Sequence, residues 1–143
     1  MACPYFYPVK SRTSPGDTQH AMLPLGDLWA GECRAEPLHP CDAAESGLRM
    51  LCNLGYARGT CERFPGAPEI PDAVRFTIAS DDGSVIRLLF AIERDHHPFL
   101  HGPLEYSTTR AAFSPEPDDE NFGRQARAYV DSYLRRKREA TTH

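Results

Sequence analysis

The strongest constraint on the fold is a run of alternating apolar residues between positions 74 and 92. Val74, Phe76 and Ile78 alternate with polar or small residues, and the same period returns from Ile86 to Ile92 after a short segment that contains Gly83. A period of two on both sides of a glycine-containing loop predicts a β-hairpin with one apolar face to be covered. The second strand is apolar on much of both faces, so we expect it to be central in a small sheet.

A helical pattern near the C-terminus supplies a cover for that face. We expect a helix from Asp118 or Asp119 to about Arg138, preceded by an acidic, proline-bearing linker over residues 114–120. Its acidic start and basic end suit the helix dipole, and we interpret the basic run 135–138 as a solvated helix end. The apolar stripe that would pack on the hairpin consists of Phe122, Ala126, Tyr129, Val130, Tyr133 and Leu134.

The first half of the chain has weaker patterns. Residues 1–40 are rich in proline and glycine, and we expect little regular structure there. A short helix is expected from about residue 43 to 54, with Asp42 and Glu45 at capping-box spacing and Gly55 as its end.

All five cysteines lie in this first half, within the first 61 of 143 residues. The N-terminus lacks the basic and apolar pattern of a secretory signal and the chain has no apolar run of membrane-spanning length, so we expect a cytoplasmic protein with no membrane contact. Disulfides are rare in that reducing compartment, so clustered cysteines indicate a metal first. The five are Cys3, Cys33, Cys41, Cys52 and Cys61.

The gaps between successive cysteines are 29, 7, 10 and 8 residues, without the short knuckle pairs typical of zinc sites. An iron–sulfur cluster also takes four thiolates and is a larger body, so its ligands can come from separate segments. We therefore predict a [4Fe-4S] cluster on the first, second, fourth and fifth cysteines, with Zn²⁺ as the alternative. The predicted ligands are Cys3, Cys33, Cys52 and Cys61.

Cys41 is the cysteine that we predict not to be a ligand, because the loop expected around it contains few apolar residues. The competing interpretation makes Cys41 the alternative fourth ligand, since a thiol just ahead of a helix N-terminus has a lowered pKa.

A second group of reactive side chains follows the hairpin in segment 93–106, expected to be a loop with Asp95, His96, His97 and His101. His96 or His101 is a candidate fourth metal ligand beside three cysteines, or a proton donor beside a cofactor. With Asp95 as its orienting group, a histidine here would also serve as a general base. The simplest alternative is that these histidines satisfy local backbone groups.

These patterns predict one small α+β domain over residues 1–143. A loop-rich, metal-tethered half (1–65) precedes a β-hairpin-based antiparallel sheet with a C-terminal helix packed on it (72–143). The leading hypothesis for function is an iron–sulfur protein in electron transfer, redox or oxygen sensing, or a larger redox system, with a redox partner protein. The alternatives are a structural zinc module and a small metal-assisted enzyme that uses the histidine segment. A net charge of −4 argues against nucleic acid as a partner.

Overall fold

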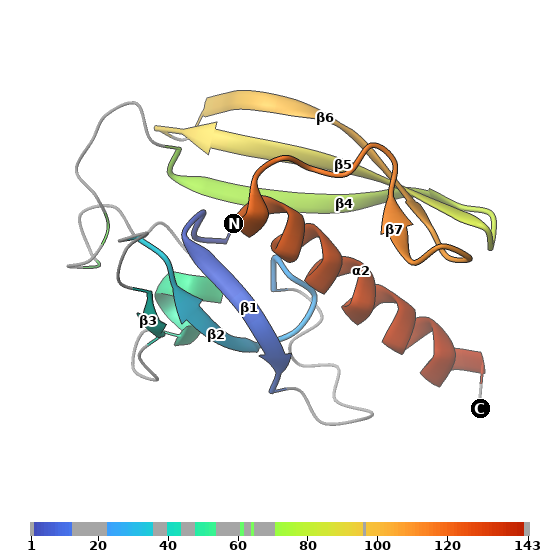
Figure 1. Ribbon diagram of the computed structural model, residues 1–143, viewed down its shortest axis with the longest axis horizontal. Coiled ribbons are helices and arrows are strands. Elements are labelled where there is room, and N and C mark those ends of the chain that lie inside the picture. The colour runs from blue at the N-terminus through green and yellow to red at the C-terminus, as the bar shows by residue number, and fades with distance from the viewer. Residues whose placement is uncertain are drawn as a thin grey trace.

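The computed structural model describes residues 2–12, 23–35, 40–43, 48–53, 61, 64, 71–95 and 97–141. Over these ranges the chain forms a three-stranded and a four-stranded antiparallel sheet, with a long helix between them (Figure 1). The first sheet has the order β1-β2-β3, formed by Phe6–Ser11, Trp29–Cys33 and Cys41–Asp42. The second has the order β4-β5-β6-β7, formed by Ala73–Asp81, Val85–Arg94, His97–Ser107 and Ala112–Phe113. A short π-helix, η1, spans Leu48–Asn53, and the long helix, α2, spans Glu120–Thr141.

The predicted hairpin is confirmed as β4 and β5. Phe76 lies opposite Phe90 in the ladder, so two apolar side chains of the alternating runs share one face. Gly83 adopts φ +91 in the connecting turn, a conformation that favours glycine. The expectation that the second strand is central is also confirmed, because β5 pairs with β4 on one side and β6 on the other.

The loop predicted over segment 93–106 is wrong, because most of it belongs to β6, which pairs with β5. Pro98 and Pro103 hide this strand in the sequence, since a proline cannot donate a hydrogen bond to a ladder. They are tolerated because β7 pairs with the last two residues of β6, which leaves the proline-bearing part at the edge of the described sheet.

The expectation of little regular structure in residues 1–40 is also wrong, because β1 and β2 form an antiparallel pair. Pro8 and Gly31 resemble strand breakers in the sequence, but the structure uses both. Pro8 lies at an irregularity of the ladder, and Gly31 lies so close to β1 that a Cβ there would clash with the carbonyl oxygen of Tyr7. A sheet therefore organises this half of the chain.

The helix expected over residues 43–54 is described only as η1. The expected cap at Glu45 and end at Gly55 lie outside the described residues, and Asp42 belongs to β3. The inward face is as expected, since Leu48 is buried and Cys52 packs against the core.

The predicted C-terminal helix is confirmed as α2, which begins within two residues of the expected start and extends three residues further. Asp119 caps it, because its Oδ1 accepts a hydrogen bond from Phe122 N at 2.8 Å. The rings of Phe122 and Tyr129 lie 5.6 and 5.7 Å from the ring of Phe76, so the apolar stripe covers the hairpin face as predicted. Among the described helices, none has the length and hydropathy that crossing a membrane would require.

A second stripe of α2 packs on the first sheet. Trp29 Nε1 donates to Ser132 Oγ at 3.2 Å, and Arg124 Nε donates to Pro8 O at 2.6 Å. Buried residues of both sheets and of α2 belong to one hydrophobic cluster. The helix therefore joins the two halves of the chain through a common core (Figure 1).

The basic end of α2 is less solvated than expected. Arg135 and Arg136 both donate to Oδ1 of Asp27, a carboxylate that is 1% exposed. Lys137 Nζ donates to Asp81 Oδ2 at 2.8 Å. Arg135, Arg136 and Lys137 therefore tie the end of the helix to the rest of the fold.

Candidate metal centre

Cys52 lies on η1, which the side chain of Asn53 fastens to β2. Asn53 is fully buried, and its Oδ1 accepts a hydrogen bond from Trp29 N at 2.9 Å. Its Nδ2 donates to Trp29 O at 2.9 Å and to Leu48 O at 2.8 Å. The amide side chain of Asn53 thus accepts from one backbone group of β2 and donates to another, as the backbone of a paired strand would. These hydrogen bonds place the adjacent Cys52 beside β2, the strand that ends at Cys33.

Cys3 lies where the N-terminal segment passes from the second sheet to the first. Ala2 exchanges two backbone hydrogen bonds with Val74 of β4, so the N-terminus is held on the second sheet. Cys3 N then donates to Cys52 O at 3.1 Å, which brings the first and fourth cysteines of the chain together. Cys3 itself is 9% exposed.

The turn that carries Cys3 is held by α2. Phe6 N donates to Cys3 O at 3.1 Å across Pro4, and Gln125 Nε2 donates to Cys3 O at 2.7 Å and to Phe6 O at 2.8 Å. Gln125 is 1% exposed, so these hydrogen bonds form away from water. Neither Gln125 nor Asn53 was identified by sequence reasoning, because a buried polar side chain has no periodic signal.

Cys33 ends β2 on the same face as Phe6, its partner in the β1 ladder. Arg34 N extends the pairing by donating to Tyr5 O at 2.9 Å. The turn that begins at Cys3 therefore runs directly into the strand that pairs with Cys33.

Cys61 reaches the same neighbourhood through Phe64. Phe64 N donates to Cys61 O at 3.2 Å, and the Phe64 ring stands edge-on to the Tyr5 ring with centroids 5.3 Å apart. Both Cys61 and Phe64 pack against the hydrophobic core.

The electrostatics of the thiols reflect this gathering. Burial raises the pKa of Cys3 from 9.0 to about 12, against a hydrogen bond from the backbone of Tyr5, and the thiols of Cys52, Cys33 and Cys61 raise it further. Burial also raises the pKa of Cys52 to about 11, followed by the effects of Cys33 and Cys61. Because such effects weaken with distance, the four predicted ligands are neighbours in the folded chain.

These thiols are not drawn tightly around one point. Within the part of the chain that the structure describes, no three His, Cys, Asp or Glu side chains lie close enough together to hold one metal ion. The arrangement is a loose group of sulfur atoms from four separate segments.

Cys41 lies in β3, so the loop expected around it is wrong. It is directly opposite Cys33 in the β2–β3 ladder. Its role as the cysteine that is not a ligand, or as the alternative fourth ligand, stays a prediction.

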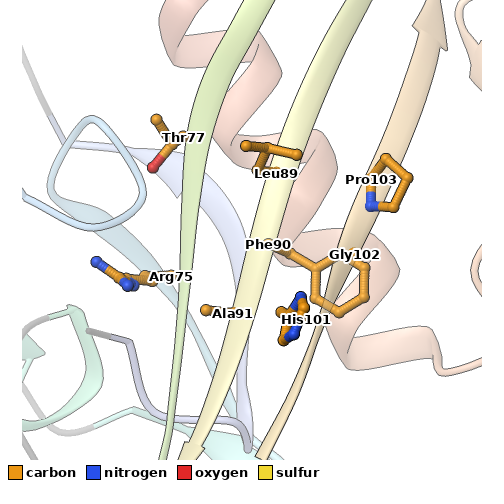
Figure 2. A pocket seen from close by; sticks show the side chains of 8 residues that line it. All are labelled: Arg75, Thr77, Leu89, Phe90, Ala91, His101, Gly102 and Pro103. Carbon is orange, nitrogen blue, oxygen red and sulfur yellow. The ribbon is translucent and has the colours of Figure 1, made fainter. Parts of the chain in front are cut away.

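The histidine segment is not brought to the cysteines. Phe90 of β5 contacts Phe122 of α2 at 5.0 Å between ring centroids, so the next residue, Ala91, faces away from α2. His101 is opposite Ala91 in the ladder and shares that outer face. Figure 2 shows His101 in a shallow hollow there, with α2 behind the sheet, whereas the turn that carries Cys3 is bonded to α2.

The other members of this segment have local surroundings. His97 is exposed at the start of β6, and Asp95 adopts φ 51 just after β5. Asp95 N donates to Asp72 Oδ2 at 2.6 Å, which fixes the turn after β5. Among the described residues, no contact between Asp95 and a histidine is seen. His96 lies outside the described residues.

In comparisons with known proteins, no protein-family model, curated protein or solved structure matches this chain.

Proposed function

We propose that this chain binds an iron–sulfur cluster, most simply a [4Fe-4S] cluster, through Cys3, Cys33, Cys52 and Cys61. One observation carries the proposal: contacts of the backbone and of the Tyr5 and Phe64 rings bring these four cysteines, from separate segments, into one neighbourhood of the fold. Burial as small hydrophobic residues would also bring thiols to a core, but it does not explain why all five cysteines lie within the first 61 residues. Four thiolates are the ligand set of such a cluster.

The spacing of the thiols supports a cluster over a single zinc ion. No two cysteines have the C-x2-4-C spacing typical of zinc sites, whereas the irons of a cluster occupy a larger body and can take thiolates from separate segments. A cluster would also act as the metal tether between the N-terminal turn, β2 and η1.

The surrounding residues suit a redox centre. A bound cluster supplies reversible electron transfer, and hydrogen bonds to sulfur and solvent exposure set its potential. The backbone hydrogen bond from Tyr5 favours the thiolate of Cys3, and the edge-on rings of Tyr5 and Phe64 would add apolar surroundings near Cys3 and Cys61. Gln125 and Asn53 hold the backbone on either side.

The thiols are unequally covered, which bears on the physiological role. Cys3 is buried, whereas Cys33, Cys52 and Cys61 are half-buried. Electrons would pass to a partner protein on the less covered side, either in electron transfer, in redox or oxygen sensing, or in a larger redox system. The protein would work in the reducing cytoplasm, where thiols stay available as ligands.

The test is anaerobic purification of the full chain, with a visible spectrum and iron, sulfide and zinc analysis of one sample. We expect a brown protein with about four irons and about four sulfides per chain. Cys61→Ser should lose the iron, and Cys41→Ser is the matched control that should keep it. Circular dichroism checks that both variants fold.

Two results would overturn the cluster. A colourless protein with about one zinc per chain would make it a structural zinc module. A folded protein with neither metal would refute metal binding altogether. Iron loss in folded Cys41→Ser would instead make Cys41 a ligand and correct the proposed set.

A further inference from the structure

Cys33 and Cys41 are direct partners in the β2–β3 ladder, so their side chains lie on the same face of the first sheet. Ala43 N donates to Gly31 O at 2.9 Å two positions along the same ladder. Hydrogen-bonded pairs recur at every second position, so Cys33 and Cys41 also form such a pair, with Cα atoms about 5.5 Å apart. This separation lies inside the range of about 4.4–6.8 Å found in disulfides.

The pair is also within reach of a small oxidant. Both cysteines are half-buried thiols, and neither forms a disulfide in the structure. Strand β3 has two residues and lies at the edge of its described sheet, next to the exposed Pro40. A short edge strand can shift slightly more easily than a central one, which allows the two Cβ atoms to approach bonding distance.

We propose that Cys33 and Cys41 form a redox-active dithiol that a hydroperoxide converts to a disulfide. One thiol loses its proton, its thiolate attacks an oxygen of hydrogen peroxide, and the O–O bond breaks to give a sulfenic acid and hydroxide, which takes up that proton and forms water. The second thiol attacks that sulfur, the S–S bond forms, and a second water leaves. Two thiols and one hydrogen peroxide thus give one disulfide and two waters.

The bridge should be readily reversible. Cβ atoms of a directly opposite pair are about 4.5–5.5 Å apart, whereas a disulfide holds them at about 3.8 Å. Closing that gap strains the ladder, and a strained disulfide is more easily reduced. Reduced glutathione should therefore reopen it.

The inference concerns the metal-free chain and does not require the proposed cluster. If the cluster binds, Cys33 cannot hold iron and bridge Cys41 at once, so the bound metal should protect the pair. Oxidation would then occur after metal loss and delay its rebinding.

The experiment uses the full chain, stripped of metal with a chelator, reduced, and treated with one equivalent of hydrogen peroxide. Trypsin cleaves after Arg12, Arg34 and Arg49, and each of the five cysteines falls in a different tryptic peptide, so mass spectrometry assigns any bridge without ambiguity. We expect peptides 13–34 and 35–49 to be joined and two thiols to be lost per chain. Glutathione should separate the peptides again.

Cys41→Ser should abolish this bridge, and Cys61→Ser should leave it unchanged. A dominant bridge from Cys33 to another cysteine, a bridge between two chains, or no bridge in the native sequence would overturn the inference. Peptide mapping of the native sequence is enough to decide whether the Cys33–Cys41 bridge forms, so the test does not depend on the folding of a variant. Iron analysis is a separate readout: a Cys33–Cys41 bridge in a chain that binds no iron supports the dithiol and refutes the cluster.

Discussion

Replacing Asn53 with alanine should be among the most damaging single changes in the first half of the chain. The fully buried side chain satisfies Trp29 N, Trp29 O and Leu48 O, all backbone groups. Each buried polar group left without a partner costs about 1–3 kcal/mol. Some relaxation toward water lowers the sum, so we expect a loss of about 3–5 kcal/mol. That is a large share of a total stability of about 5–15 kcal/mol.

Urea unfolding of the reduced, metal-free protein measures this loss as a lower midpoint with an unchanged slope. Asn121→Ala, the same truncation in the half-buried first turn of α2, is the matched control and should cost at most about 1 kcal/mol. A loss below about 1 kcal/mol for Asn53→Ala would refute the view that this side chain holds η1 on β2.

Asn53→Asp separates the two directions of hydrogen bonding. The carboxylate can still accept from Trp29 N, but it cannot donate to Trp29 O or Leu48 O. It should be at least as destabilising as alanine at neutral pH and should recover in part in acid, when the protonated group donates again. An equal penalty at both pH values would contradict this reasoning.

Two further changes test the electrostatics. The pKa of the Cys3 thiol is raised from 9.0 to about 12 in the folded chain. Between these two pH values the unfolded chain releases the proton and the folded chain keeps it. The contribution of this thiol to the free energy of unfolding is therefore fully present below pH 9.0 and is lost as the pH rises toward 12. At a pH of about 10.5 the reduced, metal-free native chain should have lost about 2 kcal/mol more than metal-free Cys3→Ala in urea unfolding. Parallel pH profiles would contradict the burial of this thiol. Asp27→Ala should cost about 3 kcal/mol or more, because it removes the buried carboxylate shared by Arg135 and Arg136. Thermal unfolding measures that loss, and a change within about 0.5 kcal/mol would show that water replaces the carboxylate without penalty.

The elements that could be predicted are those with a local pattern. The alternation from Val74 to Ile92 and the stripe from Phe122 to Leu134 appear in the sequence because each element must present one apolar face. Strand β6 escaped prediction because Pro98 and Pro103 are tolerated only at an edge, and being at an edge is a property of the assembled sheet. Gly31 is a second example: β1 passes so close to β2 at this position that only a residue without a side chain fits, and that contact is also a property of the assembled sheet.

The candidate site follows the same division. The choice of Cys3, Cys33, Cys52 and Cys61 came from residue type and spacing. The side chains that hold them did not, because Gln125 bonds to a residue 122 positions away, and no local pattern carries such a contact. Sequence reasoning also placed the histidine segment beside the metal as one option, whereas strand alternation turns His101 to the other face of the sheet.

The sequence by itself determined the chemistry available to this protein: five thiols confined to one half, a hairpin with one apolar face and a helix to cover it. Only the tertiary structure decided which groups meet. α2 carries two stripes that pack on different sheets, so burying both brings the N-terminal turn, β2 and η1 together. Periodicity is a property of neighbours along the chain. The meeting of the N-terminal turn, β2 and η1 depends instead on burying apolar surface between segments far apart in sequence. The free energy gained by that burial offsets the entropy lost in closing the loops between the segments.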